Sequence, residues 1–402
     1  MHEQPLTGLV LSGGGARAAY QVGVLRAISR LRREAGAADR GNPFGVICGT
    51  SAGAINATAL ACNADFFDDA VAGLCEVWES FHAGRVYRAD SIGMVRTGAQ
   101  WLTMLSIGWV LARWRRARPR SLLDNQPLSE LLRLAVPLRR LRPLMRRGHL
   151  RALAITASSY SSGEHLTFYQ SETPIAPWSR TQRVAVATEI GIPHLMASSA
   201  IPFVFPAVEL EREGRREWCG DGSMRQTAPI SPAIHLGAQR VLVIGAGRMQ
   251  EPVGRAPDNT GYPSIAQIAG HTLSSIFLDA LAVDVERLQR INRTLALLSP
   301  EQQRDTPLRP VEALVIAPSQ RLDDVAARHQ ASLPAPVRAL LRGAGVSGQG
   351  EQARGAALAS YLLFETPYTS ELMALGEADT LARREEVLAF FGWASPPEAA
   401  SA

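Results

Sequence analysis

Short apolar runs alternate with helical patterns in the first part of the chain, and this alternation predicts strands that lead into helices. Residues 8–12 (GLVLS) and 44–48 (FGVIC) are apolar runs of strand length. Residues 18–35 follow the first run with apolar positions three or four apart, and residues 52–60 follow the second as an alanine-rich stretch that suits a helix. Two strand-loop-helix units in succession predict an α/β fold in which neighbouring strands run parallel.

The rest of the chain continues this mixture of strands and helices. Further strand candidates are residues 151–158, 165–169, 208–211, 217–219, 240–245 and 311–317, and further helix candidates are residues 65–81, 264–293 and most of the chain after 321. Residues 161–163 (SSG) predict a hairpin turn, and residues 193–206 predict a helix and a loop. Residues 133–151 contain an arginine cluster interrupted by Pro137 and Pro143, which predicts an irregular solvated segment.

A serine lies at the junction between the second strand and the second helix. Residues 49–53 read Gly-Thr-Ser-Ala-Gly and match the pattern G-x-S-x-G. In this motif the serine sits on a tight turn, and the flanking Gly49 and Gly53 leave room that a larger residue would fill. The unpaired N–H groups at the start of the helix and its dipole favour negative charge beside the serine oxygen. Ser51 is therefore a candidate nucleophile.

A glycine loop, residues 13–15, connects the first strand to the first helix. Together with Ala18 it also fits the dinucleotide-binding pattern G-x-G-x-x-A, which requires an acidic residue at the end of the second strand. That strand ends instead at Cys48, and Asp39 precedes it. Because parallel strands bring their carboxyl ends to one edge of a sheet, the loop would lie beside Ser51, where its N–H groups suit an oxyanion. A flexible glycine turn is the plainer interpretation.

An aspartate between two glycines follows a later strand candidate, in the sequence Gly220-Asp221-Gly222-Ser223. A tight loop of this kind can direct the carboxylate towards another element of the fold. An ordinary Asp-Gly turn also explains the same four residues and is the interpretation that the sequence alone favours. From these residues alone both interpretations stay open.

The basic residues are all arginine, and this excludes several kinds of catalysis. The chain has 402 residues, 46% of them hydrophobic, which is enough for a substantial core in one large domain or two to three smaller ones. Its net charge is +5, and none of its 42 basic residues is lysine. A phosphate-loop lysine, a Schiff base, a Ser/Lys nucleophile pair and a kinase lysine all need an amine, so each of these is excluded.

The four cysteines form no C-x-x-C pair and predict reduced, mostly buried thiols at Cys48, Cys62, Cys75 and Cys219. The first residues contain no basic stretch followed by an apolar one, so no signal peptide is predicted. We therefore expect a cytoplasmic protein.

One segment suggests contact with a membrane surface. Residues 99–120, from Ala99 to Arg120, combine an uncharged stretch containing tryptophan with adjoining arginines. The stretch is shorter than a membrane span of about 20 residues. It predicts either peripheral contact with a lipid interface or a buried helix with a solvated basic end. No aromatic interleaving or fold motif supports binding to nucleic acid.

Three motifs together resemble those of the patatin-like phospholipase family. They are LSGGGARAAY from Leu11, GTSAGA from Gly49 and GDGS from Gly220, in matching order and spacing. The resemblance implies a three-layer α/β/α core with a mostly parallel central sheet over residues 6–246. It leaves residues 247–402 as a mostly helical C-terminal extension that packs on the core and contains one further strand candidate.

The resemblance also implies a function and the residues that perform it. It implies a lipid acyl hydrolase of the phospholipase A or lysophospholipase type, with a Ser-Asp dyad, an acyl-enzyme intermediate and no need for a metal or cofactor. Carried over by position, the site residues are the nucleophile Ser51, its partner Asp221, the oxyanion residues Gly13, Gly14, Gly15 and Arg17, and the elbow glycines Gly49 and Gly53. Two small departures from the family pattern are Ala18, where the family usually has glycine, and Ser223, where it has glycine or alanine.

Two other classes of function remain as alternatives. An α/β-hydrolase triad runs in the order serine, acid, histidine, and His235, His271 and His329 all follow Asp221. However, Ser51 comes after only one earlier strand, whereas that fold needs more strands before its nucleophile. A non-enzymatic protein would use the glycine loop alone to bind a nucleotide or a lipid surface. The sequence leaves open the headgroup, the acyl chain, any activating partner and the oligomeric state.

Overall fold

The computed structural model describes residues 5–88, 121–249, 262–346 and 355–393. The strands in these residues are β1 (Thr7–Leu11), β2 (Val46–Thr50), β3 (Ala152–Ser159), β4 (His165–Ser171), β5 (Ser179–Arg180), β6 (Arg183–Ala187), β7 (Val208–Arg212), β8 (Arg215–Asp221), β9 (Arg240–Ile244) and β10 (Glu312–Ile316). The predicted segment from Ala99 to Arg120 lies outside the described residues.

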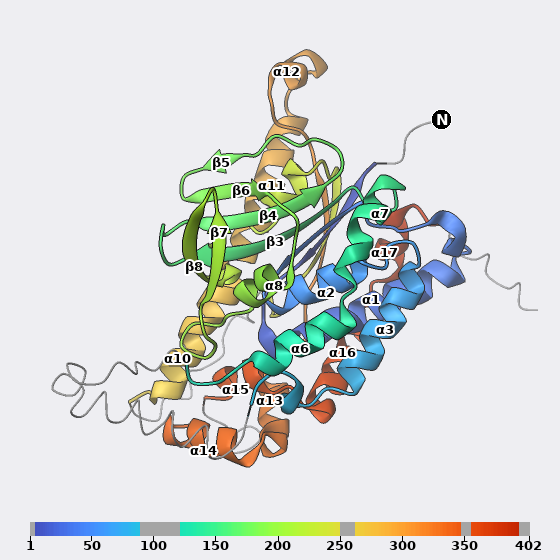
Figure 1. Ribbon diagram of the computed structural model, residues 1–402. Helices are drawn as coiled ribbons and strands as arrows, with labels where there is room; N and C mark the ends of the chain where they lie inside the picture. The colour runs from blue at the N-terminus through green and yellow to red at the C-terminus, as the bar shows by residue number, and fades with distance from the viewer. Residues whose placement is uncertain (1–4, 89–120, 250–261, 347–354, 394–402) are drawn as a thin grey trace, which may run out of the picture.

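All of these strands belong to one sheet (Figure 1). Its order is β10-β9-β1-β2-β3-β4-β6-β5, and β8 pairs with both β3 and β7. The five strands from β10 to β3 run parallel, and the antiparallel pairs lie between β3 and β4, between β5 and β6, and around β8. The predicted mostly parallel sheet is confirmed.

Helices follow most of the strands along the chain. They are α1 (Ala19–Glu34), α2 (Ala52–Ala61), α3 (Phe67–Glu79), α6 (Gln126–Ala135), α7 (Leu141–Arg146), α8 (Ile192–Ser198), α9 (Ser231–His235), α10 (Ile265–Ser274), α11 (Ala280–Ala296), α12 (Pro300–Asp305), α13 (Leu322–His329), α14 (Ala335–Gly343), α15 (Ala356–Leu362), α16 (Thr366–Leu381) and α17 (Arg384–Phe391). The first strand and helix therefore lie within a few residues of the positions that the apolar pattern predicts.

The sheet has a helical layer on each face, as side chains of β1 illustrate. Leu9 and Leu11 point into a core shared with α1, α2, α3 and α16, while Val10 points into a second core shared with α9 and α11. Alternate residues of a strand face opposite sides, so a strand that is apolar throughout must be covered on both. Each fully buried leucine contributes about 1.5–3 kcal/mol. The three-layer α/β/α architecture is confirmed.

The end of β3 determines which two segments meet beside the second strand. Residues 152–156 of β3 pair with β2, so that Thr156 lies opposite Thr50. The next residue, Ala157, pairs with Asp221 of β8, while β4 occupies the other edge of β3 along almost its whole length. Strands β2 and β8 therefore lie end to end along one edge of β3. This arrangement brings Ser51, which follows Thr50, next to Asp221.

The C-terminal part of the chain adds both to the sheet and to one helical layer. Strand β10 pairs with β9 as an edge strand of the central sheet. Helix α16 crosses α1 so closely that a Cβ on Gly23 would lie 1.9 Å from Met373 O, and one on Gly376 would lie 2.2 Å from Tyr20 O. Glycine at both crossing points permits this contact. The boundary between residues 246 and 247 stays a prediction.

Residues 133–151 are more ordered than the arginines and prolines predict. They hold the end of α6, a short turn of 3₁₀ helix (Leu138–Arg140) and α7. Three apolar side chains of α7, Leu141, Leu144 and Met145, are buried. Arg140 donates to both carboxylate oxygens of Asp65 at 2.8 and 2.6 Å. The prediction of an irregular solvated segment is wrong because the apolar residues between the arginines recur at helical spacing and anchor the helix.

The long helical region after residue 264 contains an irregularity. A π-helical turn (Ser275–Asp279) joins α10 to α11. The continuous stretch Ile265–Ala296 is long and apolar enough to cross a membrane by length and composition alone. Within it, Leu281, Val285 and Leu288 pack on the sheet.

Candidate active site

Ser51 occupies a strained turn between β2 and α2. Its backbone has φ 55° and ψ −130°, a conformation that costs a non-glycine residue free energy and is typical of a nucleophile at a strand-to-helix turn. The residue is 1% exposed. Its N–H donates to Ser198 Oγ at 2.9 Å, which fixes the turn against α8. The hydroxyl is thus held at the helix N-terminus.

The two elbow glycines have no space for a side chain. A Cβ on Gly53 would lie 2.5 Å from the carbonyl oxygens of both Leu11 and Ser12, and one on Gly49 would lie 2.4 Å from Gly53 O. These neighbours are backbone atoms that cannot move aside as a flexible side chain would. Glycine at both positions allows α2 to begin directly against the end of β1.

Asp221 ends β8 in a fully buried position. It is 0% exposed, and its N–H donates to Ala200 O at 3.0 Å. Its carboxylate oxygen Oδ1 accepts the N–H of Ser223 at 2.9 Å. The other oxygen, Oδ2, is buried and has no hydrogen-bond partner among the described residues. One carboxylate oxygen is therefore positioned while the other remains able to accept a proton.

Burial raises the pKa of Asp221 to about 6. The hydroxyl of Ser51 and the N–H and hydroxyl of Ser223 act against burial and lower this pKa, because each stabilises the charged form. Among the described residues neither hydroxyl makes a hydrogen bond of ordinary geometry to the carboxylate, so both act on it as close neighbours. A pKa near 6 leaves Asp221 ionised at neutral pH but makes it a much stronger base than an exposed aspartate.

The glycine loop lies next to Ser51, as parallel pairing of β1 and β2 requires. A Cβ on Gly13 would be 3.1 Å from Ser51 Cβ. Within the described part of the chain, the N–H groups of Gly13, Gly14 and Gly15 donate to no acceptor. Several backbone donors are therefore free close to the serine, where a tetrahedral intermediate would carry its negative charge.

Buried amide side chains of α1 and α2 hold the two ends of this loop. Gln21 Nε2 donates to Ser12 O at 2.7 Å, and Asn56 Nδ2 donates to Ala18 O at 3.3 Å and to Gln21 Oε1 at 3.2 Å. Ser12 and Ala18 flank the glycine loop, so both of its ends are held by α1 and α2.

The sequence predicts Arg17 in the oxyanion region, but the structure places its side chain elsewhere. Its N–H donates to Gly14 O at 3.1 Å, and its side chain is 2% exposed. The guanidinium binds Asp323 at 2.5 Å and Ser360 at 2.8 Å and lies 4.1 Å from the ring centre of Tyr361. The prediction is wrong because residues of the C-terminal extension draw the side chain away from Ser51. Arg17 instead anchors the glycine loop to that extension.

The three histidines of the alternative triad lie elsewhere. His235 stacks on Trp178 with ring centres 4.6 Å apart, His329 hydrogen-bonds to Glu371, and His271 is exposed. None of them contributes to the pKa of Asp221. None of these three histidines therefore forms a Ser-His-Asp arrangement with Ser51.

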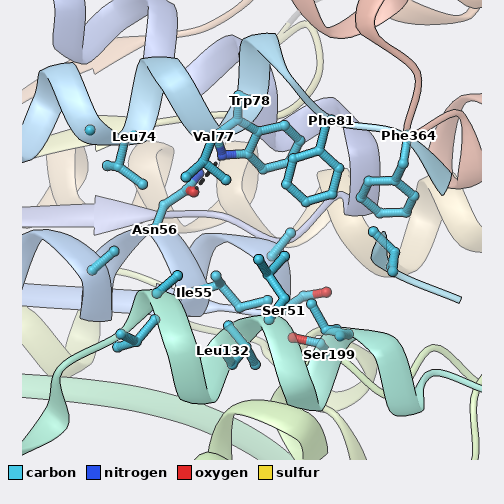
Figure 2. Close-up of a pocket in the computed structure, with 18 of the residues that line it drawn as sticks. Ser51, Ile55, Asn56, Leu74, Val77, Trp78, Phe81, Leu132, Ser199 and Phe364 are labelled. Atoms are coloured by element: carbon cyan, nitrogen blue, oxygen red, sulfur yellow. Dashed lines mark hydrogen bonds between the residues drawn. The ribbon is translucent and has the colours of Figure 1, made fainter. Parts of the chain in front are cut away.

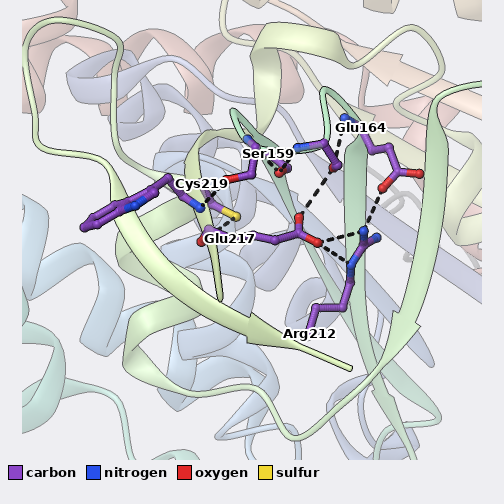
Figure 3. A network of polar contacts seen from close by, with 8 residues as sticks. Ser159, Glu164, Arg212, Glu217 and Cys219 are labelled. Atoms are coloured by element: carbon purple, nitrogen blue, oxygen red, sulfur yellow. Dashed lines mark hydrogen bonds and ion pairs between the residues drawn. The ribbon is translucent and has the colours of Figure 1, made fainter. Parts of the chain in front are cut away.

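A polar network holds the strand that carries Asp221 (Figure 3). Arg212 donates to Glu217 and to Glu164, both at 2.8 Å, and Ser162 Oγ lies 3.4 Å from Glu217. These contacts join the β7–β8 hairpin to the turn between β3 and β4. Because Glu217 is four residues before Asp221 on the same strand, the network keeps the carboxylate in register.

An apolar cavity of about 470 Å³ begins at Ser51 (Figure 2). Its floor is α2, which contributes Ile55. Its walls come from α3, α6 and the segment around Phe364, and they include Leu74, Val77, Trp78, Leu132 and Phe364. Lining residues of the floor run from Ser51 to Asn63, a distance of about 18 Å along the helix. Phe66 lines the far end and is 62% exposed, so the cavity reaches the surface there.

Comparison with known proteins agrees with this geometry. The family model described as patatin-like phospholipase matches residues 9–234, more than half of the chain. The chain belongs to the patatin-like phospholipase family. This assignment confirms the predicted family. No curated protein matches the sequence significantly.

Solved structures resemble this patatin-like chain only distantly. VipD from Legionella pneumophila is 13% identical, with 92% of this chain and 67% of VipD covered and a TM-score of 0.32. Human GIVD cytosolic phospholipase A2 with methyl gamma-linolenyl fluorophosphonate is 13% identical, with coverages of 96% and 59% and a TM-score of 0.44. The type III effector ExoU is 16% identical, with coverages of 98% and 92% and a TM-score of 0.30. The chain thus spans about three fifths to two thirds of the length of the first two.

Some residues of this patatin-like site carry no signal in the sequence. Phe277 lies 3.0 Å from the Cβ position of Gly13, and Tyr361 O lies 2.4 Å from that of Gly15. Both residues come from the C-terminal extension, far from any motif. Ser198, by contrast, lies in the segment 193–206, whose small apolar residues already indicate close packing.

Proposed function

We propose that this chain hydrolyses long-chain acyl esters of lipids with Ser51 as the nucleophile and Asp221 as its base. Asp221 accepts the proton of the Ser51 hydroxyl while Ser51 Oγ forms a bond to the ester carbonyl carbon. The C–O bond to the leaving alcohol then breaks, and the alcohol takes the proton from Asp221. Water then gives a proton to the same carboxylate as its oxygen bonds to the acyl carbon. The bond from that carbon to Ser51 Oγ breaks, Ser51 Oγ takes the proton back from Asp221, and the fatty acid leaves.

The observation that carries this proposal is the end-to-end meeting of β2 and β8 along one edge of β3. It sets a buried carboxylate with a pKa of about 6 beside a hydroxyl on a strained turn. A packed structural core has no need of such a pair, since burying an ionisable group without a partner costs free energy.

The free N–H groups of the glycine loop would stabilise the oxyanion. Gly13, Gly14 and Gly15 follow β1 directly and lie beside Ser51. Preorganised donors of this kind are worth about 3–4 kcal/mol each in the transition state. The dyad therefore relies on these donors to compensate for a base weaker than histidine.

The apolar cavity suits an acyl chain. It starts at Ser51 and follows α2 between two other helices, and most of its lining is apolar. Burying a methylene group is worth about 0.8 kcal/mol, so kcat/KM should rise about fourfold with each added methylene until the cavity is filled.

Activity on phospholipid, lysophospholipid and diacylglycerol vesicles, compared with that of Ser51→Ala, tests the proposal and identifies the headgroup. Equal activity of the two proteins would contradict it.

Ala59→Phe should shorten the preferred acyl chain. Ala59 lies on the cavity floor one turn beyond Ile55, about 12 Å along α2 from Ser51, so a phenyl ring there would block the far half. We expect kcat/KM on palmitoyl esters to fall at least about tenfold while butyryl esters change less than about threefold. Ala72→Phe on the exposed side of α3 is the matched control. Equal losses on both chain lengths would show that the acyl group binds elsewhere.

The non-enzymatic alternative predicts tight nucleotide binding without hydrolysis. Titration of the protein with ATP and NAD separates the two possibilities, because the glycine loop would then close around a pyrophosphate.

A cytoplasmic location and peripheral membrane contact through residues 99–120 remain proposals, which cell fractionation tests.

A further inference from the structure

A second hydroxyl lies at the centre of the site, and it belongs to Ser223. This residue follows Asp221 in a short 3₁₀ turn (Gly222–Arg225) and is 4% exposed. Its N–H donates to Asp221 Oδ1 at 2.9 Å. Its Oγ is buried and has no hydrogen-bond partner among the described residues. A buried hydroxyl without a partner costs free energy, so its presence here needs a reason.

Ser223 Oγ lies beside the glycine loop, close to Ser51. The oxygen is 2.3 Å from the point that a Cβ on Gly13 would occupy, and Ser51 Cβ is 3.1 Å from the same point. Asp221 Oδ2 is also buried without a partner. Two residues whose backbone N–H and carboxylate are already joined thus carry a hydroxyl donor and a carboxylate oxygen that are both unbonded in the resting structure. Such bonds often close only when substrate is bound.

We propose that Ser223 is a positioning residue whose hydroxyl donates to the Asp221 carboxylate and keeps it ionised at a pH where burial alone would protonate it. The inference rests on the proposed Ser51–Asp221 mechanism. Within that mechanism, Ser223 extends the active range of the enzyme towards lower pH and moderates the strength of the base.

The surroundings of Asp221 leave few other groups that could perform this task. The titratable groups that face it in the described structure are Tyr160 of the β3–β4 turn, Cys219 of its own strand and His165 of β4, whose ring hydrogen-bonds to the backbone of Gly222. Burial raises the pKa of Tyr160 and brings that of Cys219 to about 12, and it lowers that of His165 to about 4. All three are uncharged between pH 5 and 9, so these groups supply no cation.

Ser223→Ala should move the acid limb of the pH profile. Without the hydroxyl, the charged carboxylate loses a donor, so Asp221 protonates at higher pH. We expect the acid limb of kcat/KM for p-nitrophenyl butyrate to shift upwards by about 1 pH unit. At pH 5 the variant should be about tenfold slower than the wild type, whereas at pH 8 it should be equal or faster because its base is stronger. A merely structural loss would lower the rate equally at every pH.

The control variant is Ser158→Ala. Ser158 Oγ is also buried without a partner and lies opposite Gly220 on the neighbouring strand, outside the proposed machinery. Its acid limb should coincide with that of the wild type. If Ser223→Ala does not fold, Ser223→Cys, which keeps a weaker donor, should give a smaller shift in the same direction.

The outcomes separate this inference from the proposed function. If Asp221→Asn abolishes activity but the acid limbs of Ser223→Ala and the wild type coincide, or the limb moves to lower pH, the role of Ser223 is refuted and the dyad stands. If Asp221→Asn remains active, the dyad itself is refuted.

Discussion

Asp221→Asn should lower kcat about 10⁴-fold while Ser51 and the cavity stay intact. An asparagine keeps the shape of the carboxylate and can still accept the N–H of Ser223, but it cannot take the proton of Ser51. Removing the acid of a serine-protease triad costs a similar factor, and here the carboxylate acts directly as the base. The wild-type rate should itself fall tenfold per pH unit below about pH 6, where Asp221 becomes protonated.

The matched control is Asp284→Asn. Asp284 is another buried aspartate whose pKa is raised by burial, and its Oδ2 accepts the N–H of Ile230 at 3.0 Å in the second core of the fold. This variant should lose some stability and keep its kcat. Comparable losses of kcat in the two variants, with both proteins folded by circular dichroism, would show that Asp221 is a structural residue.

Gly13→Ala should lower kcat by about 10² to 10³. The added methyl group would lie 2.3 Å from Ser223 Oγ, 3.0 Å from Phe277 Cδ1 and 3.1 Å from Ser51 Cβ. Ser223 can rotate away, but the other two contacts force the glycine loop or the serine to shift. Displacing one oxyanion donor costs about this factor, and KM for a bound acyl chain should change little.

Gly343→Ala in α14 serves as its control. A Cβ there meets no atom within 4 Å, and the backbone is not in the left-handed region. Both variants replace a glycine hydrogen with a methyl group. A difference in kcat between them on the same soluble ester therefore reports where the methyl group was added and not its size. An unchanged kcat in Gly13→Ala would mean that the oxyanion is stabilised by other donors.

Much of the central fold follows from local patterns. The apolar run before Ser51 has to be a strand buried on both faces, and Gly49 and Gly53 permit only a tight turn after it. The same reasoning places the glycine loop at the carboxyl edge of a parallel neighbour. Asp221 is different, because its four-residue motif fits an ordinary turn, and only the family resemblance linked it to Ser51.

Features set by distant contacts were not predictable in this way. Arg17 turns away from the site because Asp323 and Ser360, more than 300 residues later, offer it partners in a buried position. Phe277 likewise closes on the glycine loop from the π-helical turn. No spacing rule connects such segments, so their contacts emerge only from the packing of the C-terminal extension on the sheet.

The helices in residues 133–151 were also not predictable from residue types alone. Arginine and proline there indicate exposure and irregularity, yet Leu141 and Leu144 are buried and hold a helix in place. The burial of these apolar side chains stabilises the helix more than the neighbouring prolines and arginines favour an irregular, exposed segment.

Labelling with a long-chain fluorophosphonate, followed by peptide mass mapping, tests the dyad most directly. We expect a single adduct on Ser51 in the wild type and none in Ser51→Ala. In the wild type the labelling rate should rise with pH around a midpoint near 6, and in Asp221→Asn it should be strongly reduced. An adduct on another residue, such as Ser199 of the cavity wall, or labelling of Ser51 that does not depend on Asp221, would contradict it.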